Sequence, residues 1–484
     1  METMPLALRP HVGEVRGDPD KLDPLVRRAR AQWRVALVSM PFDVHFRPSI
    51  QLGLLKAIAS SHGFPVETFH LNLDFAHQVG PEPYEAVCEY ERTFGRGALG
   101  EWLFSVAAFG DEAPDHGRRL LDHYPTYTER FLAEIEQPEE YLLTLRDKEV
   151  PKYLDRLMET IAWDRFEVVG FTATFQQNTA AFALAARIKR EFPSIKVLFG
   201  GANFEGEMGV ELVRSIPCID YAVIGEGDIA FPEFLISLQE GRDPAEVAGV
   251  ACRRNGTVSE PRMRPLFRQL DELPFPDYDE YFERAERLEL IPAGHRRRVY
   301  VPFESARGCW WGQKHHCTFC GLNGEGMAFR SKSPERVREE LGQAAKRYGI
   351  VRFSAVDNIL EMSYLKTFLP KLVEEEAGYE LFYSLKANLT REQIKLLSEA
   401  GVRRVQPGIE SLNSHVLDLM SKGITGIRNV NTLRWMRFYG IYVGWNILCG
   451  FPGETAEDYR RQEALIRRIA HLQPPSGIRR ISMG

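Results

Sequence analysis

E-S-A-R-G-C-W-W-G-Q-K-H-H-C-T-F-C-G-L-N-G, residues 304–324, places three cysteines on one short loop after an apolar stretch. These are Cys309, Cys317 and Cys320, spaced C-x7-C-x2-C. Three thiolates on one loop can hold a metal centre and still leave one coordination position open. The stretch therefore predicts a metal-binding loop that can also take a substrate or cofactor at the metal.

Two kinds of metal centre fit these residues. A [4Fe–4S] cluster normally has four cysteine ligands, and no fourth cysteine lies nearby in the sequence, so one iron would stay free. The alternative is a structural zinc site with three cysteines and either His315 or His316. Both histidines adjoin Cys317, where tetrahedral closure against the other two cysteines would strain the loop. The loop alone leaves both centres open and favours the cluster.

The residues that follow predict alternating strands and helices. Residues 299–305 read as a buried strand that delivers the cysteine loop at its C-terminal end. Ser333-Pro334 is typical of a helix start and Gly349 of a helix end. Further strands are expected at 351–358, 381–388, 402–410 and 442–453, and helices at 334–347, 361–376, 390–400, 412–421, 427–438 and 455–472.

Strands that alternate with helices pair in parallel, and their C-terminal ends gather the functional residues. Polar residues do fall at these expected strand ends: Asp357, Asn358, Lys386, Asn388, Gln406, Glu410 and Asn446.

The first half of the chain predicts a second parallel sheet. Five strands are expected at 34–41, 65–69, 166–174, 196–201 and 219–227, with helices at 50–62, 178–192 and 207–216. This is the pattern of an open, doubly wound sheet, whose ligand crevice lies beyond the strand C-termini. Glycines at 200–201, 225 and 227 end two of the strands and would let a large planar cofactor approach the backbone. No G-x-G-x-x-G follows the first strand, so a nicotinamide or flavin is poorly supported.

Composition limits the class of protein. A chain of 484 residues exceeds one ordinary core, so two domains are expected. A net charge of -6 offers no basic field for nucleic acid. No run of 18 apolar residues and no signal peptide is evident, and seven cysteines, three of them clustered, suit a reducing compartment. We expect a soluble, cytoplasmic protein with neither nucleic acid nor membrane as a partner.

Three longer motifs carry a family resemblance. G-C-W-W-G-x-x-x-H-C-x-F-C-G-L-N-G, then M-x-F-R-x-K-S-P, and later Q-P-G-I-E-S-L resemble the radical SAM family called RiPP maturation radical SAM protein 1, over about residues 33–477. The usual superfamily spacing is C-x3-C-x2-C, so the seven-residue gap is a departure. The resemblance implies an α/β chain: an N-terminal doubly wound parallel-sheet cobalamin-binding domain, then a partial (β/α)6 radical SAM barrel.

The resemblance also implies cofactors and their sites. Cys309, Cys317 and Cys320 would be the [4Fe–4S] ligands, and the unique iron would chelate S-adenosylmethionine. The implied contacts of S-adenosylmethionine are Phe319, Lys386, Asn388, Glu410, Gly450 and Phe451. The implied cobalamin contacts are Pro41, Ser49, Thr172, Thr174, Gly200, Gly201, Asn203, Gly225, Glu226 and Gly227. Asp43-Val44-His45 is similar to a D-x-H-x-x-G signature, but Pro48 stands at its glycine position, so we interpret His45 as a loop residue.

The expected domain layout has four parts. Residues 1–30 are a flexible segment, 31–265 the cobalamin-binding domain with a helical insertion at about 76–163, 266–298 a linker, and 299–484 the barrel. Family members ordinarily continue well beyond this chain's last residues. We therefore expect a barrel truncated at its C-terminus, without its sixth strand and C-terminal region.

By resemblance, the activity is C-methylation of an unactivated carbon in a ribosomal precursor peptide of bacteriocin type. The expected partners are that peptide and an electron donor such as flavodoxin or ferredoxin. Two alternatives stay open: a radical modification without methyl transfer, such as epimerisation or ring formation, and a catalytically silent remnant that only binds cofactor or peptide.

Overall fold

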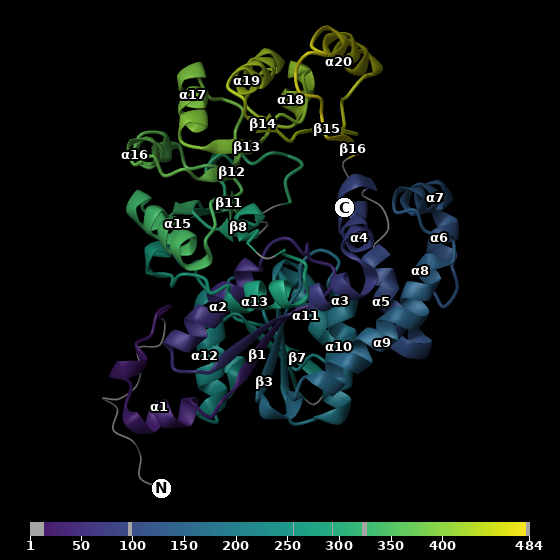
Figure 1. Ribbon diagram of the computed structural model, residues 1–484, viewed down its shortest axis with the longest axis vertical. Coiled ribbons are helices and arrows are strands. Elements are labelled where there is room, and N and C mark those ends of the chain that lie inside the picture. The colour runs from purple at the N-terminus through teal and green to yellow at the C-terminus, as the bar shows by residue number, and fades with distance from the viewer. Residues whose placement is uncertain (1–13, 95–98, 255, 293, 322–326, 481–484) are drawn as a thin grey trace. The chain divides into compact units, whose positions relative to one another are not determined.

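The computed structural model describes residues 14–94, 99–254, 256–292, 294–321 and 327–480. The chain divides into two compact units, which are described separately. The first comprises Met1–Phe267 and Glu272–Ala293, and the second comprises Arg268–Asp271 and Gly294–Gly484. Each unit contains a main sheet of its own, parallel in most of its strands (Figure 1).

The first unit is built on a sheet with the strand order β2-β1-β3-β4-β5-β6-β7. The first five strands in this order pair in parallel, which confirms the five strands expected from the sequence. Their bounds are β1 Val35–Ser39, β2 Val66–His70, β3 Val168–Thr172, β4 Lys196–Gly200 and β5 Tyr221–Val223. Because parallel strands end at the same edge, the loops after them form one continuous rim.

Apolar residues on both faces of this sheet explain the two helical layers. Val35 and Leu37 of β1 pack with α2 (Ile50–Ser61) and α12 (Gly227–Gln239), whereas Ala36 and Val38 pack with helices of the opposite layer. That opposite layer includes α5 (Leu99–Phe109), α9 (Val150–Thr160) and α10 (Asn178–Glu191). Figure 1 shows the two layers on either side of the strands. A strand buried on both faces is the mark of a doubly wound sheet.

Two strands of this sheet were not expected. β6 (Val250–Arg254) and β7 (Thr257–Ser259) form an antiparallel hairpin that extends the sheet beyond β5, so the sheet is not wholly parallel. The sequence carries a signal for it, because Asn255-Gly256 is a common two-residue hairpin turn.

The interval 76–163, expected to be a helical insertion, is helical in the structure. Its helices, with α3 at its start, are α3 (Leu71–Val79), α4 (Pro81–Phe94), α5, α6 (Arg119–His123), α7 (Pro125–Glu134), α8 (Tyr141–Thr144) and α9. Helix α11 (Gly206–Ser215) lies between β4 and β5 in the chain. In the described part of the chain, no helix is long and apolar enough to cross a membrane.

The expected flexible segment is ordered where the structure describes it. Residues 1–13 lie outside the described residues, but α1 (Pro24–Arg30) is a helix and Val15 is buried. Arg30 is fully buried and its guanidinium donates to the backbone oxygen of His62 at 2.8 Å. This contact joins residues far apart in sequence, so part of the segment that the sequence predicts to be flexible packs against the first unit.

The expected linker 266–298 also differs. It contains α13 (Asp279–Arg287), whose Tyr281, Phe282 and Ala285 are buried in the first unit. Apolar side chains at helical spacing explain the packing. The division between the units falls at Gly294, close to the end of the predicted linker.

The second unit has a five-stranded parallel sheet in the order β14-β13-β12-β11-β8. Its strands are β8 (Tyr300–Phe303), β11 (Arg352–Ala355), β12 (Glu380–Leu385), β13 (Val402–Pro407) and β14 (Tyr442–Val443). Its helices are α15 (Pro334–Tyr348), α16 (Leu369–Glu374), α17 (Arg391–Glu399), α18 (Ser414–Leu419), α19 (Gly426–Phe438) and α20 (Ala456–Arg468). Sequential strand order with intervening helices is the arrangement of a (β/α) barrel.

Helix α15 begins and ends as the sequence predicts. The Ser333 hydroxyl accepts a hydrogen bond from the backbone N–H of Arg336 at 3.2 Å, and Gly349 closes the helix with a φ of 67°. A short antiparallel pair, β9 (Ala306–Arg307) and β10 (Arg330–Ser331), brackets the cysteine loop.

The end of the barrel differs from expectation in two ways. The expected fifth strand divides into β14 and β15 (Asn446–Cys449) at Gly444-Trp445. β15 pairs in parallel with β16 (Gly477–Arg480), so the predicted absence of a sixth strand is wrong. β16 has the sequence G-I-R-R, whose charges and short length hide the apolar pattern by which strands are recognised.

Candidate functional site

The cysteine loop starts at a position that only glycine can occupy. Gly308 has a φ of +76°, and a Cβ there would lie 2.4 Å from the backbone oxygen of Ala328. The next residue, Cys309, accepts a hydrogen bond at its Sγ from the backbone N–H of Gly312 at 3.3 Å. Between Cys309 and Cys317 the chain forms one helical turn, α14 (Gly312–His315). Gly308 and α14 thus fix the direction in which the loop leaves β9.

The three thiols are half-buried and form no disulfide. Burial raises the pKa of Cys317, the ammonium groups of Lys422 and Lys386 oppose this, and the thiols of Cys320 and Cys309 reinforce it. The five groups therefore act on one another electrostatically. This donor set fits an anionic iron–sulfur cluster, since thiolates share one loop and two cations balance them.

As they stand, the side chains are not in a ligand geometry. Among the residues that the structure describes, no group of three or more His, Cys, Asp or Glu side chains is placed to hold a metal ion. The assignment of Cys309, Cys317 and Cys320 as cluster ligands stays a prediction from the sequence.

A turn after α18 supports the cysteine loop. We call residues 419–423 the support turn. The backbone N–H and hydroxyl of Thr318, between two of the cysteines, donate to the backbone oxygens of Met420 and Leu419, both at 3.1 Å. The Lys422 ammonium lies 5.4 Å from the centroid of the Phe319 ring. The support turn thus contacts the loop at Thr318 and at Phe319.

The structure brings several predicted S-adenosylmethionine residues together. The rings of Phe319 and Phe451 meet edge to face, with centroids 5.9 Å apart. Glu410 accepts an ion pair from Lys422 at 3.2 Å and has a positive φ of 55°. The backbone oxygen of Glu410 accepts from the N–H of Leu448 at 2.9 Å, which ties it to β15. Phe319, Glu410 and Phe451 therefore belong to one neighbourhood next to the cysteine loop.

Asn388 and Lys386 follow the same strand, β12, but differ in their surroundings. The Asn388 Oδ1 atom is buried and has no hydrogen-bond partner within the described chain, as expected of an acceptor that faces a ligand. Lys386 already has partners: its Nζ donates to the backbone oxygen of Lys422 and lies 3.3 Å from the centroid of the Trp311 ring. Burial, then the charge of Lys422, lowers the pKa of Lys386 to about 8.

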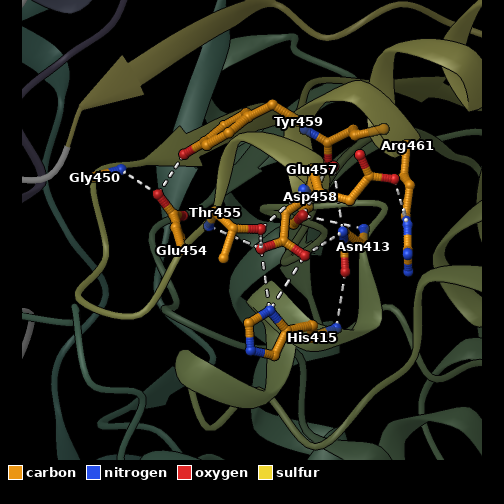
Figure 2. A network of polar contacts seen from close by, with 11 residues as sticks. Asn413, His415, Gly450, Glu454, Thr455, Glu457, Asp458, Tyr459 and Arg461 are labelled. Atoms are coloured by element: carbon orange, nitrogen blue, oxygen red, sulfur yellow. Dashed lines mark hydrogen bonds and ion pairs between the residues drawn. The ribbon is translucent and has the colours of Figure 1, made fainter.

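A polar network holds the loop that contains Gly450 (Figure 2). The backbone N–H of Gly450 donates to Glu454 at 2.8 Å, and the Tyr459 hydroxyl bonds to the same carboxylate. Thr455 and Asp458 form a reciprocal capping box at the start of α20. Gly450, predicted to approach the adenine, is thus anchored to the first turn of α20.

The same network joins α20 to α18. Asp458 accepts from Asn413 at 3.0 Å and lies 3.1 Å from Nδ1 of His415, as Figure 2 shows. The hydrogen bond from the Thr455 hydroxyl, with further bonds from the Thr455 backbone and His415, lowers the pKa of Asp458 to about 2. α18 therefore connects the support turn at its end with the Gly450 loop through its start.

In the first unit, the predicted cobalamin residues lie on the rim after β3, β4 and β5. Thr172 pairs with Gly200 across the strands, and Thr172 Oγ1 is buried without a hydrogen-bond partner in the described chain. Gly201 has a φ of +106°, and a Cβ there would lie 2.6 Å from the Ala173 backbone oxygen. A Cβ on Gly225 would meet nothing within 4 Å. An unpartnered hydroxyl and two side-chain-free positions fit a large ligand at this rim.

Other predicted cobalamin residues have protein partners. Thr174 donates to the Gln177 side chain at 3.0 Å, and Asn203 donates to the Phe175 backbone oxygen at 2.9 Å. The Glu226 carboxylate accepts from the backbone N–H of Phe267 at 3.1 Å, while Gly227 begins α12. These residues shape the rim.

The loop 41–49 is anchored by a hydrogen bond to the buried His70, which in turn contacts Glu280. Pro41 and Ser49 are buried, and Ser49 donates through its backbone N–H to His70 Nε2 at 3.1 Å. His70 Nδ1 lies 2.6 Å from Glu280 of α13, which places the imidazole proton on Nδ1. His45 lies 3.3 Å from Glu85, and its interpretation as a loop residue stays a prediction.

Sequence reasoning missed three residues of these neighbourhoods. Phe175 on the rim is 71% exposed and has a positive φ of 50°, which is uncommon for an aromatic residue. Trp311 and Lys422 contact the predicted cluster and cofactor residues. Their signals were weak: Trp311 lies inside the cysteine motif, but the cation that contacts its ring, Lys386, is over 70 residues away in the chain.

Comparisons with known proteins show what this chain is similar to. The model of the Radical SAM superfamily matches residues 303–461. An uncharacterised methyltransferase of Pyrococcus horikoshii is 28% identical over 337 residues, which cover 66% of this chain and 70% of that protein. The anaerobic magnesium-protoporphyrin IX monomethyl ester cyclase of Synechocystis is 22% identical over 279 residues. The match covers 57% of this chain, and the chain spans only about half, 54%, of the cyclase.

Among solved structures, the radical S-adenosylmethionine methyltransferase TsrM of Kitasatospora setae, with cobalamin and a [4Fe–4S] cluster bound, superposes with a TM-score of 0.61. The two sequences are 18% identical, and the match covers 93% of this chain and 76% of TsrM. The likeness therefore shows that this chain shares the fold of TsrM. With a superfamily match that contains the cysteine loop, this chain is a radical SAM enzyme.

Proposed function

We propose that this enzyme is a cobalamin-dependent radical SAM methyltransferase that modifies a ribosomally made precursor peptide. One observation carries the cofactor part: a single chain joins the radical SAM segment to a doubly wound sheet, in the fold of TsrM, over 93% of its length. The Pyrococcus relative, named a methyltransferase, supports methyl transfer. The peptide substrate is supported by the three sequence motifs alone.

The proposal gives each cofactor a place. Cys309, Cys317 and Cys320 would hold the cluster, and the rim after β3, β4 and β5 would hold cobalamin. When bound, these groups and S-adenosylmethionine supply hydrogen-atom removal from an unactivated carbon, followed by methyl transfer. The protein contributes binding, orientation and exclusion of water.

Two groups beside the cysteine loop suit the polar end of S-adenosylmethionine. Asn388 offers an unpartnered carbonyl oxygen, and Glu410 offers a carboxylate that Lys422 holds in place. Both are acceptors, so they match the ammonium and hydroxyl donors of the cofactor. Phe319 and Phe451 provide an apolar contact for the adenine, next to the Gly450 turn.

A radical modification without methyl transfer is the second candidate, because the Synechocystis relative is a cyclase. The mass of the product separates the two, since methylation adds a methyl group and epimerisation leaves the mass unchanged.

The test starts from protein prepared without oxygen and supplied with iron, sulfide and cobalamin. It then receives S-adenosylmethionine, a reductant such as reduced flavodoxin, and a precursor peptide encoded beside its gene. We expect a cubane absorption spectrum, release of 5′-deoxyadenosine and a methylated peptide. Absence of the cubane spectrum, or an identical spectrum after all three cysteines become alanine, would contradict the proposal.

A further inference from the structure

Trp311 occupies the centre of the contacts between the cysteine loop and the rest of the barrel. Its ring lies 3.3 Å from the Lys386 ammonium, measured to the ring centroid, and 4.4 Å from the His315 ring, one turn later on α14. Gly423 of the support turn leaves room for it, because a Cβ on Gly423 would lie 2.3 Å from the indole Cη2. The ring therefore fits between β12's end and the support turn.

Lys386 completes the same contact from the barrel side. Its ammonium donates to the backbone oxygen of Lys422, so one group touches both the support turn and the indole face. A cation over an indole face is attracted more strongly when it is desolvated, and Lys386 is only 7% exposed. The ammonium thus fastens the loop to the turn while its charge lies near Cys309 and Cys317.

We propose that Trp311 and Lys386 form a clamp that positions the cysteine loop on the support turn, and that Lys386 acts on the cluster through Trp311 instead of binding S-adenosylmethionine. Both are positioning residues. This inference rests on the proposed function, because it concerns the cluster that the three cysteines would hold. It also assigns a role to the long C-x7-C gap, since the added residues form α14 and carry His315 to the Trp311 ring.

The test compares Trp311→Ala, Trp311→Phe, Lys386→Met, Lys386→Arg and the double variant Trp311→Ala/Lys386→Met. Each is reconstituted without oxygen, and bound iron and the electron paramagnetic resonance spectrum of the reduced cluster are measured before S-adenosylmethionine is added. Lys371→Met is the matched control, because Lys371 is an exposed lysine of the same unit whose partner is Glu374. Thermal unfolding of the apoproteins checks that each variant folds.

The clamp predicts a several-fold loss of bound iron in Trp311→Ala and an altered spectrum in Lys386→Met before any S-adenosylmethionine is present. Trp311→Phe and Lys386→Arg should restore much of the native behaviour, since they keep a ring and a cation. The double variant should lose no more than Trp311→Ala alone, because residues that act through each other are non-additive.

A different pattern would overturn the clamp. If Lys386 binds S-adenosylmethionine directly, Lys386→Met leaves the spectrum of the cofactor-free cluster native and abolishes only its change on adding the cofactor. If wild-type protein assembles no cluster, the proposed function fails by itself. The clamp is then judged by iodoacetamide labelling of the apoprotein: faster labelling of Cys309 and Cys317 in Trp311→Ala supports it, and unchanged rates reject it.

Discussion

Asp357 is a buried carboxyl group at the end of a barrel strand, and its ionisation should make the free energy of unfolding depend on pH. The residue follows β11 and is 3% exposed, and its carboxylate accepts from the backbone N–H of Ser305 at 2.8 Å and contacts the Ser305 hydroxyl. Burial raises the pKa of Asp357 to about 7, although the hydrogen bonds from Ser305 oppose the rise. Ser305 lies just before the cysteine loop, so this pair joins the start of the loop to the neighbouring strand.

Asp357→Asn should make the free energy of unfolding less dependent on pH. A carboxyl group with a raised pKa in the folded state binds more protons there than in the unfolded chain, so its contribution to stability falls as pH rises from about 4 to about 7. The variant should therefore gain stability relative to wild type between about pH 5 and about pH 8, by at most about 4 kcal/mol. Urea unfolding across this range measures the difference.

Ser305→Ala should change the pH dependence of stability in the opposite direction to Asp357→Asn. It removes a hydrogen bond that lowers the pKa of Asp357, so the loss of stability should extend to higher pH than in wild type. Parallel pH profiles for wild type and both variants would contradict the assignment of this response to Asp357.

The position of an individual residue could be predicted where it depends on a local sequence motif alone. The cysteine spacing and the glycine turns are local, so the sequence places Cys309 and Gly201 in their loops without any tertiary information. Lys386 shows the limit. Its position at a strand end was predicted, but its partners Trp311 and Lys422 come from other loops, and only the fold brings them together.

Among the elements, α20 depends on its capping box. The Thr455 hydroxyl accepts from the Asp458 backbone N–H at 3.3 Å and donates to the Asp458 carboxylate at 2.8 Å. Thr455→Ala removes the cap and should destabilise the protein by about 1 kcal/mol. It should also weaken binding of S-adenosylmethionine, because the first turn of α20 holds the Gly450 loop. Urea unfolding and equilibrium dialysis measure the two effects.

Glu457→Gln is the matched control for this helix. Glu457 lies one residue from Asp458 and pairs with exposed Arg460 and Arg461 (Figure 2 shows the latter pair). Exposed pairs contribute little, so this variant should bind S-adenosylmethionine like wild type. An equal loss of affinity in both variants would mean that helix stability in general, and not the cap, controls the loop.

Helix α13 is held to the first unit by a buried charge network. Arg284 pairs with Asp74 at 2.6 Å and also contacts Glu280, which in turn holds His70. Arg284→Met leaves two carboxylates without their shared cation, so we expect a loss of about 3 kcal/mol in the free energy of unfolding. Arg287→Met, on the exposed side of the same helix, should change it little. Comparable losses in both variants would show that the network does not hold the helix.

The elements found from the sequence share a regular apolar pattern, as in β1, β3 and α15. The missed elements do not. β6 ends in two arginines, β7 has only three residues, β14 and β15 separate at a glycine, and β16 carries two arginines in four residues. α13 was interpreted as a linker because prolines precede it. In each case a tertiary partner, a paired strand or a packed face, stabilises a segment whose own pattern is weak.

At the scale of the whole molecule, each of the two units has its own main sheet, and we propose that each of these sheets binds a different cofactor at its strand ends. The contacts that the structure describes for Thr318 of the cysteine loop are with Leu419 and Met420 of the second unit, whereas β3, β4 and β5 belong to the first unit. The protein should therefore bind each cofactor when the site of the other is lost, even though the proposed methyl transfer requires both cofactors.

Gly201→Ala and the triple cysteine-to-alanine variant should consequently show reciprocal losses. The added methyl group at Gly201 would lie 2.6 Å from a backbone oxygen and would shift the rim, so cobalamin uptake should fall several-fold while bound iron stays at the wild-type level. Replacement of Cys309, Cys317 and Cys320 should abolish the cluster and leave cobalamin uptake unchanged. Absorption spectra of the reconstituted proteins report both cofactors in one measurement. Loss of both cofactors in either variant would mean that the two units bind them cooperatively, and separate binding would leave methyl transfer as the first step that needs the whole chain.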